Sequence, residues 1–429
     1  MTTPAQPALA ALLTRKRLEI ALLICASAIY FFAYLQRVAI PGQFFDELQS
    51  AFSLRADAVT FLGAIYLYIY GGMQPFAGVM NDRLGANRVL LIGGLLLAGG
   101  SIWFALAPAY PLLVAARALV GLGSSLIFIS LVKALATLFS PRYFAPLLSL
   151  VMFTGALGGV VGTLPIKWLA GLWGWRAALL WAGLLCALAF LGAALIARRA
   201  AAPTPQAPPL WPSLRAVLRN RAAWPLMLAA PLTFTIYFLL QTVIGVKFLR
   251  DVAGLTGALA STITFVMMVV NLSIVLSGGF LVEMFGRRRK PFILLGVGFL
   301  LLSLLLLLAG LWLRLGGGWF LVCYICLALS SFVSPVSNVL MREMNPAGAI
   351  GTAIGALNGL CYLGVALLAS AAGTVMTAFR AGAVQTATAI VYPREAYFAI
   401  FLLCGALALV ALISALYLRD TRGVAVAEA

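Results

Sequence analysis

Two stretches of the chain decide its fold: Gly78-Val-Met-Asn-Asp82-Arg83-Leu-Gly85-Ala-Asn-Arg88 and Gly279-Phe-Leu-Val-Glu283-Met-Phe-Gly286-Arg287-Arg288-Arg289-Lys290. In each, an acid follows the first glycine by four residues, a second glycine follows it by seven, and basic residues come next. Each stretch also joins two long apolar runs. A single copy would be a weak signal, but two copies at matching places in two sets of apolar runs indicate an internal repeat.

The composition is that of a membrane protein. Of the 429 residues, 64% are hydrophobic and 9% are charged, whereas a soluble domain carries roughly 45–50% apolar and about 25% charged residues. With a mean hydropathy of +1.08, these figures exclude a soluble globular protein, a disordered chain and a coiled coil. The chain has no histidine, which removes histidine-based nucleophilic catalysis, metal ligation and proton relays. We therefore expect no enzyme activity, no catalytic residue, no metal site and no cofactor.

Twelve apolar runs are long enough to cross a bilayer, which takes about 20 residues in a helix. The predicted spans are 18–42, 57–80, 88–108, 111–138, 144–170, 177–197, 224–246, 256–281, 291–313, 318–341, 348–377 and 396–418. Between the sixth and seventh runs, a proline-rich segment precedes a basic segment, for which we predict a short helix on the inner membrane surface. The predicted domains are an N-terminal six-helix half (1–197), a cytoplasmic linker (198–223) and a C-terminal six-helix half (224–429).

The positive charge is distributed as a topology signal and not as a nucleic-acid surface. The net charge is +18, but the basic residues lie between apolar runs, so we expect no nucleic-acid partner. Eighteen Lys and Arg residues fall on the side of the N-terminus, six on the other side and five inside the runs. This bias predicts that both termini are cytoplasmic. Lys167 and Lys247, near the outer ends of their runs, are expected to snorkel to the outer water.

The duplicated loop resembles the signature loop of the major facilitator superfamily, and the resemblance covers the whole chain. The first copy is intact, whereas the second has Glu283 for aspartate and Met284 for the basic residue. Arg117-Ala-Leu-Val-Gly121-Leu-Gly123 resembles the second signature of the family. The resemblance implies an all-α transporter with twelve membrane helices in two pseudo-symmetric halves, each made of two inverted three-helix repeats, that works by alternating access. The fifth run lacks the Gly-Pro pair of the drug antiporters, which argues against drug/proton exchange.

The loop motif suits a gate between two states of a transporter. Gly78 and Gly85 permit a tight turn and a close helix approach. Asp82 can pair with an arginine such as Arg142 or sit at a helix N-terminus of the other half. The resemblance implies that this contact latches the inner face while the transporter is open outward. The predicted gate residues are Gly78, Asp82, Arg83, Gly85, Arg88, Arg142, Glu283 and Arg287.

Arg37 is the most informative charge inside a run. A cation at mid-bilayer costs about 2.5–3.5 kcal/mol on insertion scales, so it should face a partner or a water-filled cavity. Tyr30, Tyr34 and Arg37 have the spacing i, i+4, i+7 and share one helix face. The arrangement resembles the first-span arginine with which organic-anion members of the superfamily bind their substrate, and arginine can hold a carboxylate through two parallel hydrogen bonds. The alternative is an arginine anchored at the outer membrane interface.

Other polar groups in the runs complete the predicted site. Tyr70 shares a face with Tyr66 in the second run, and Lys133 either serves the cavity or snorkels inward. The predicted substrate-binding residues are Arg37, Tyr34, Tyr30, Tyr70, Lys133, Gln241, Tyr237 and Asn358. No acid lies in the middle of a run, so Asp46 and Glu47, just past the first run, are the candidates for proton coupling. Arg117 is assigned either to coupling or to helix packing.

The sequence predicts a secondary active transporter for a small anionic or zwitterionic organic solute, such as a carboxylate or an amino acid. A cation-rich interior with almost no mid-span acid favours this solute class, moved by proton-coupled uptake or by anion exchange. An exchanger needs no titrating residue, because the solute itself neutralises the cationic site. The alternative is efflux of drugs or metabolites, which usually needs a buried acid, and a third class is a non-transporting receptor or a structural membrane protein. The expected partners are the solute, protons and the lipid bilayer, and the expected state is a monomer. The sequence leaves open the solute, the coupling ion and the direction.

Overall fold

The computed structural model describes residues 5–139, 141–197, 210–284, 288–345, 350–386 and 389–420, and most of these residues are helical. The first set of helices is α1 Ala5–Ala39, α2 Phe45–Phe52, α3 Ala56–Leu84, α4 Ala86–Leu106, α5 Tyr110–Leu138, α6 Pro141–Val161, α7 Leu164–Trp173 and α8 Trp175–Ala197. The second set is α9 Leu210–Arg219, α10 Trp224–Leu239, α11 Gly245–Ala253, α12 Gly257–Met284, α13 Lys290–Trp312, α14 Gly317–Leu329, α15 Val333–Met344, α16 Ile350–Ala378 and α17 Arg394–Leu416. Shorter elements are the π-helix η2 Leu240–Ile244, the 3-10 turns η1 Arg221–Ala223, η3 Ser330–Phe332 and η5 Phe379–Gly382, and the strands β1 Val384–Gln385 and β2 Ile390–Val391.

The twelve predicted membrane spans are confirmed. Eleven helical segments within the described ranges are long and apolar enough to cross a membrane, and a bent pair makes the twelfth. This pair is Leu150–Val161 with Leu164–Trp173, and its two parts meet at 46°. Pro165 occupies the first turn of α7, where a proline is tolerated although it would break a continuous helix. The fifth predicted span, 144–170, is therefore broken rather than straight.

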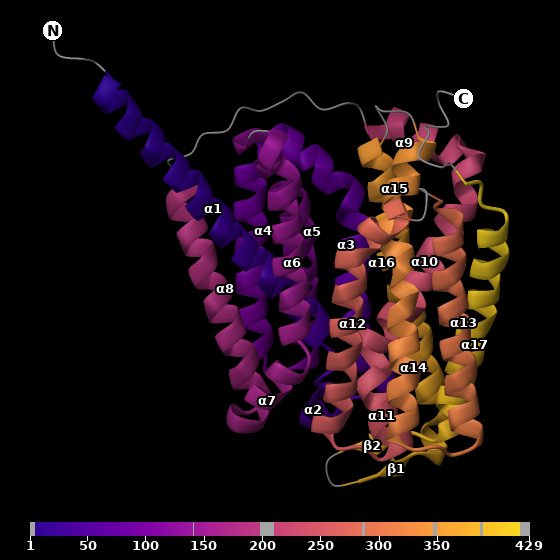
Figure 1. The fold of residues 1–429 in the computed structure, drawn as a ribbon. Coiled ribbons are helices and arrows are strands. Elements are labelled where there is room, and N and C mark those ends of the chain that lie inside the picture. The colour runs from indigo at the N-terminus through magenta and orange to yellow at the C-terminus, as the bar shows by residue number, and fades with distance from the viewer. Residues whose placement is uncertain are drawn as a thin grey trace.

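Two bundles of helices lie side by side (Figure 1). Helices α1–α8 form the N-terminal bundle, and helices α10–α17 form the C-terminal bundle. Helix α1 begins and α17 ends at one end of the molecule, which we call the terminal end. The short helix α2, helix α11 and the β1–β2 hairpin lie at the opposite end, which we call the hairpin end (Figure 1).

The two bundles meet along α3 and α16. A Cβ atom at Gly71 of α3 would lie 3.1 Å from the carbonyl oxygen of Gly359 of α16, so the two backbones approach closely there. Nearer the hairpin end, the backbone amide of Asp57 donates to the hydroxyl of Thr377 across 3.2 Å. These contacts make α3 and α16 a central seam of the molecule.

The segment between the bundles is helical where the structure describes it. Residues 198–209 of the predicted linker lie outside the described ranges, and α9 follows at Leu210–Arg219. Val217 of α9 is fully buried in an apolar cluster of the C-terminal bundle. The side chain of Asn220 donates to the carbonyl oxygen of Met344 across 2.7 Å. The predicted basic helix is thus present, and it packs on the ends of α15 and α16.

The β1–β2 hairpin is not a feature that the hydropathy pattern predicts. Its strands are antiparallel, with Val384 opposite Val391 and Gln385 opposite Ile390. Two-residue strands are too short for any alternation of polar and apolar residues to reveal them. The hairpin connects α16 to α17 and covers the hairpin end (Figure 1).

Candidate functional site

Arg37 lies in the last turn of α1, and its side chain is enclosed at the seam of the two bundles. The residue is only 2% exposed. Its Nε donates to the hydroxyl of Tyr66 across 3.1 Å, and its Nη1 donates to the hydroxyl of Tyr362 across 2.8 Å. Because Tyr66 belongs to α3 and Tyr362 to α16, the guanidinium bridges the N-terminal and C-terminal bundles. The alternative of an arginine at the outer membrane interface is not what this structure shows.

Four tyrosine rings surround this guanidinium, and we call them the tyrosine cage. The distances from Cζ of Arg37 to the ring centroids are 4.4 Å for Tyr70, 4.5 Å for Tyr34, 5.0 Å for Tyr362 and 5.9 Å for Tyr66. Such cation–π contacts stabilise a cation that is shielded from water. The Nη2 atom has no hydrogen-bond partner, and none of the ion pairs found between described residues involves Arg37. The cage therefore holds a positive charge without a counter-ion.

The structure brings some of the predicted residues to this cage and places others near it. Tyr34 and Tyr70 are members, and Tyr30 packs edge-on against Tyr34 with ring centroids 5.3 Å apart. Tyr237 of α10 is buried, and its hydroxyl has no hydrogen-bond partner. Gln241 lies in the π-helix η2, where its side chain contacts the sulfur of Met268.

Two predicted site residues are not members of the tyrosine cage, and two cage members are missing from the predicted set. Lys133 in α5 and Asn358 in α16 are half-buried, and their predicted roles stay predictions. Tyr66 and Tyr362 are the cage members that the predicted set omits. Tyr66 was recognised as sharing a face with Tyr70, and Tyr362 follows Asn358 by four residues on the same helix, so helical spacing was the available signal for both.

Arg117 is fully buried, and the hydrogen bonds that it donates to described residues go to backbone oxygens. Its guanidinium donates to the carbonyl oxygens of Leu62 at 3.1 Å, Gln36 at 3.2 Å and Ile40 at 3.1 Å. Gln36 and Ile40 lie at the C-terminal end of α1, where carbonyl groups lack partners inside the helix and attract a cation. The arginine therefore fastens α1 and α3 to α5, which is the geometry expected for the packing alternative.

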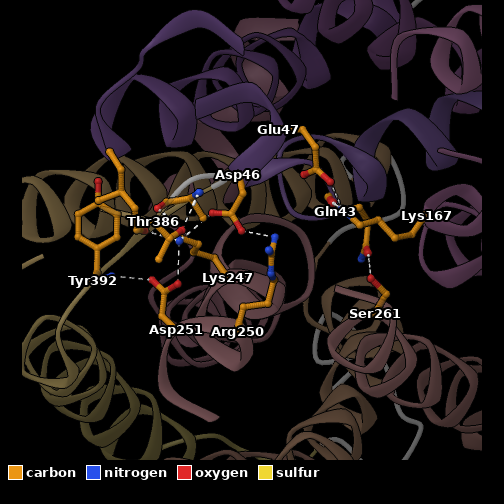
Figure 2. Close-up of polar contacts among 12 residues, drawn as sticks. Gln43, Asp46, Glu47, Lys167, Lys247, Arg250, Asp251, Ser261, Thr386 and Tyr392 are labelled. Carbon is orange, nitrogen blue, oxygen red and sulfur yellow. Dashed lines mark hydrogen bonds and ion pairs between the residues drawn. The ribbon is translucent and has the colours of Figure 1, made fainter. Parts of the chain in front are cut away.

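A buried ionic cluster joins the bundles at the hairpin end (Figure 2). Lys247 of α11 is 0% exposed, and its Nζ lies 2.7 Å from a carboxylate oxygen of Asp46 and 2.7 Å from one of Asp251. Arg250 forms an ion pair with the other oxygen of Asp46. Because Asp46 belongs to α2 of the N-terminal bundle, both of its ion pairs cross the seam. The prediction that Lys247 snorkels to water is wrong, since two carboxylates compensate its charge inside the protein.

Hydrogen bonds beside this cluster also cross the seam. Oε1 of Gln43 accepts from the hydroxyl of Ser261 at 2.7 Å, and its Nε2 donates to Thr264 at 3.3 Å. The amide of Gly42 donates to the carbonyl oxygen of Thr242 at 2.9 Å. We call the residues that join the bundles here the hairpin-end lock; they are Gly42, Gln43 and Asp46 on one side and Thr242, Lys247, Arg250, Ser261 and Thr264 on the other.

The remaining charges of this end are held inside their own bundles. Glu47 forms an ion pair with Lys167, which also donates to the carbonyl oxygen of Gln43 across 2.8 Å (Figure 2). Lys167 is thus mostly buried and paired, contrary to the prediction that it snorkels. Asp251 accepts from the hydroxyl of Tyr397 at 2.7 Å and from the backbone amide of Tyr392 at 2.9 Å. These bonds keep Asp251 fixed in the C-terminal bundle.

The predicted gate loop at the terminal end is only partly described. Gly85 has φ +83°, a conformation that favours glycine, so the predicted tight turn is present. The predicted close approach at Gly78 is wrong, because no heavy atom lies within 4 Å of a Cβ built there. Arg83 and Arg88 are exposed. The side chains of Asp82, Arg142 and Glu283, and residue Arg287, lie outside the described part of the chain.

Solved structures of transporters share this fold over nearly the whole chain. A bacterial homologue of the human lysosomal transporter Spinster, in an inward-facing conformation, superposes with a TM-score of 0.74 at 17% identity, covering 94% of this chain and 97% of that one. The peptide transporter POT in complex with sulfate gives 0.74 at 17% identity, covering 94% and 93%. A D-xylose–proton symporter gives 0.72 at 17% identity, covering 94% and 99%. At these identities the likeness shows the fold alone.

Curated relatives match shorter segments. A chloramphenicol resistance protein of Pseudomonas aeruginosa is 29% identical over 160 residues, and monocarboxylate transporter 7 of Homo sapiens is 29% identical over 146 residues. The multidrug efflux pump LfrA of Mycolicibacterium smegmatis is 37% identical over 103 residues. These segments cover 36%, 34% and 23% of this chain, and 35%, 28% and 20% of the three relatives. The chain thus aligns with about a third of their length or less.

A sequence profile described as the Major Facilitator Superfamily matches residues 22–369, which is most of the chain. The profile and the shared fold confirm the resemblance to this superfamily that the duplicated loop predicts. They also confirm that the family and the structural neighbours are transporters and not enzymes. With twelve membrane spans, a central seam between two bundles and this match, the chain belongs to the Major Facilitator Superfamily of membrane transporters.

Proposed function

We propose that the protein is a secondary active transporter that moves a small anionic or zwitterionic organic solute, such as a carboxylate or an amino acid, across a bacterial inner membrane. One observation carries this proposal. Arg37 is 2% exposed, lies at the seam between the bundles, and has an Nη2 atom without a partner and no counter-ion among the described residues. In this proposal the solute supplies the missing negative charge.

The physical argument rests on the cost of a buried cation. An ion removed from water is destabilising unless a partner of opposite charge or several hydrogen bonds compensate it. The tyrosine cage compensates Arg37 only in part, because rings and hydroxyl groups carry no net negative charge. A carboxylate would neutralise it and would be held by the geometry of the guanidinium.

Neighbouring residues would complete the solute site. The unpartnered hydroxyl of Tyr237 and the amide of Gln241 come from the C-terminal bundle, and they suit the polar or cationic part of the solute. Tyr30 supports the cage from behind Tyr34. Asn358 and Lys133 are kept as further candidates for solute contact, the role that the sequence predicts for them.

We assign the two ends of the molecule to opposite sides of the membrane. The charge bias predicts cytoplasmic termini, so the terminal end would face the cytoplasm and the hairpin end the outside. The lock is closed in this structure, which would then not be an outward-open state. Residues 1–197 and 224–429 would rock against each other about the solute site, joined by the linker 198–223. The loops around Asp82 and Glu283 would latch the terminal end in the opposite state.

Coupling would involve the acids of the hairpin end. Opening the lock removes Asp46 from both Lys247 and Arg250, so its carboxylate would meet outside water only in the outward-open state. That alternation is what a proton-coupling group needs. Glu47 and Arg117 are the further candidates. If no proton is coupled, the solute itself would neutralise Arg37 on both passages, which is anion exchange.

Uptake into proteoliposomes tests the proposal. Radiolabelled carboxylates and amino acids are offered to vesicles containing wild-type protein, the Arg37→Lys variant or the control Arg176→Lys. Arg176 lies at the hairpin end, where it donates to the carbonyl oxygens of Ala105 and Ala107. Arg37→Lys keeps the charge but loses the two-pronged grip, so solute uptake should fall about tenfold or more while the control is unchanged. Equal uptake by all three would refute the clamp.

Efflux is the second candidate, because two of the relatives are named for it. The chloramphenicol resistance protein and the multidrug efflux pump LfrA each share a segment with this chain, whereas the third relative is named a monocarboxylate transporter. An exporter would lower the drug sensitivity of a strain that expresses it and would not import labelled carboxylates. Measuring both in one strain separates the candidates.

A further inference from the structure

A hollow of about 210 Å³ opens at the hairpin end, away from the tyrosine cage. One wall comes from the N-terminal bundle, at α2 and the turn after it, and includes Gln49 and Ser53. The other wall comes from the C-terminal bundle, at η5 and the β1–β2 hairpin, and includes Arg380, Gln385 and Thr386. The volume suits a small ion or metabolite, and the walls belong to parts that separate when the lock opens.

Gln49 lines this hollow and holds a buried hydrogen-bond acceptor beside it. The residue is 2% exposed, and its Nε2 donates to the hydroxyl of Tyr392 at 3.0 Å. Burial raises the pKa of the Tyr392 phenol, so this tyrosine stays neutral. The Oε1 atom of Gln49 has no partner. A buried acceptor without a donor is destabilising, and it favours a ligand that brings an O–H or N–H group.

Arg380 supplies the charge. It is the one ionisable side chain among the residues that line the hollow, and it is exposed. Guanidinium groups bind oxyanions through paired hydrogen bonds, and the exposed hydroxyl of Ser53 adds a further donor, whereas the hydroxyl of Thr386 already donates to the carbonyl oxygen of Ala389. A wall with a cation, a hydroxyl group and an acceptor fits an oxyanion that also carries a donor.

We propose that this hollow is a binding site for a small oxyanion that bears a hydrogen-bond donor, such as monobasic phosphate, a phosphate monoester or a hydroxycarboxylate. The oxyanion oxygens bind Arg380, and the donor of the ligand binds Oε1 of Gln49. Because these residues lie in different bundles, the bound ion bridges the seam and stabilises the closed state of the hairpin-end lock. The site is distinct from the tyrosine cage and does not depend on which solute the cage accepts.

Phosphate and sulfate form a matched pair of probes. In mildly acidic buffer phosphate is a monoanion with P–OH donors, whereas sulfate is a dianion of the same shape without a donor, so charge alone would favour sulfate. Calorimetric titration of the full chain in nanodiscs, at constant ionic strength, should show phosphate binding about tenfold tighter than sulfate, the effect of about one hydrogen bond. Equal binding of the two ions would overturn the role of Gln49, and binding of neither would overturn the site.

Variants assign the binding to the hollow. Arg380→Gln should weaken the binding of both ions about tenfold or more. Gln49→Leu should remove the preference for phosphate over sulfate. As a control, Arg314 is another exposed arginine of the same end, and Arg314→Gln should leave both affinities unchanged. Thermal melting identifies any variant that fails to fold. If Arg37→Gln abolishes binding while Arg380→Gln does not, the ion belongs to the tyrosine cage and the proposal fails.

The effect on the lock has its own readout. The variant Ser261→Cys, in a background without the six native cysteines, carries a thiol at a position that is buried in the closed state. Its rate of reaction with an impermeant maleimide reports opening. Phosphate should slow this reaction severalfold in the otherwise unchanged lock and leave it unchanged with Arg380→Gln. A rate that phosphate does not alter would overturn the bridging role even if the ion binds.

Discussion

Replacing Asp46 by asparagine should open the hairpin-end lock by an amount that the structure defines. Asp46 is 4% exposed and pairs with Lys247 and Arg250 across the seam. Breaking a buried ion pair typically costs about 3–5 kcal/mol when it leaves a charge without compensation. Here Lys247 keeps Asp251 at 2.7 Å, and Arg250 is 25% exposed and can be hydrated. Asp46→Asn should therefore destabilise the closed lock by about 2 kcal/mol, which is typical of the loss of one hydrogen bond to a charged group.

That energy translates into a change of population. A difference of about 2 kcal/mol shifts a two-state equilibrium roughly 30-fold. The assay is the labelling of Ser261→Cys by an impermeant maleimide added at the hairpin end, in a background without the six native cysteines. Ser261 is fully buried in the closed lock, so its labelling rate follows the open population while that population is small. Asp46→Asn should raise the rate about 30-fold.

A second acid at the same end provides the control. Asp57 pairs with Arg55 at 3.3 Å, but the two side chains are 38% and 57% exposed. Such surface pairs contribute about 0–1 kcal/mol, and the amide oxygen of asparagine can still accept from the backbone amide of Ala58, as the carboxylate of Asp57 does. Asp57→Asn should leave the rate within about threefold of the parent. Equal rates for Asp46→Asn and the parent, or equal increases for both variants, would refute the lock.

Three other substitutions, two of them with a control variant, probe the lock, the packing by Arg117 and the clamp at Arg37. Gly42→Ala places a Cβ 2.6 Å from a carbonyl oxygen across the seam and should also speed labelling, whereas Gly72→Ala, with no atom within 4 Å, should not. Arg117→Gln removes hydrogen bonds to three carbonyl groups and should lower the free energy of unfolding by about 3 kcal/mol, measured by chemical denaturation. Tyr362→Phe removes the 2.8 Å bond that orients the clamp and should lower solute uptake about fivefold to tenfold, while Tyr68→Phe, bonded to Ser370 instead, should preserve it.

Hydropathy and the duplicated loop were sufficient to predict the fold. Each span is a long apolar run, and a helix is the only structure that satisfies its own backbone in lipid. The break in the fifth span escaped prediction because hydropathy averages over a window, although Pro165 marked the place. The β1–β2 hairpin also escaped prediction, because a two-residue strand is too short to show a periodic pattern of polar and apolar residues.

From the sequence, site residues could be placed together only when they lie on the same helix. The shared face of Tyr34 and Arg37 follows from helical spacing, and the structure keeps them in contact at 4.5 Å. Tyr362 is 325 positions away from Arg37, so no local pattern could join the two. Lys247 was misplaced for the same reason: its i+4 partner Asp251 was readable from the sequence, but its burial depends on Asp46, which only the tertiary fold brings to it.

The clamp and the lock lie on one short segment of the chain, and this links solute binding to gating in the proposed cycle. Arg37 ends α1, and Gly42 and Asp46 follow within nine residues. Arg117 binds the carbonyl groups of Gln36 and Ile40, on either side of Arg37, so the segment is fastened to α5 and must move with the N-terminal bundle. A rotation that withdraws Asp46 from the C-terminal bundle therefore also withdraws the guanidinium from Tyr362. Because one segment carries both contacts, the cage would lose Tyr362 whenever the hairpin end opens, so the solute site would change together with the gate, as alternating access requires.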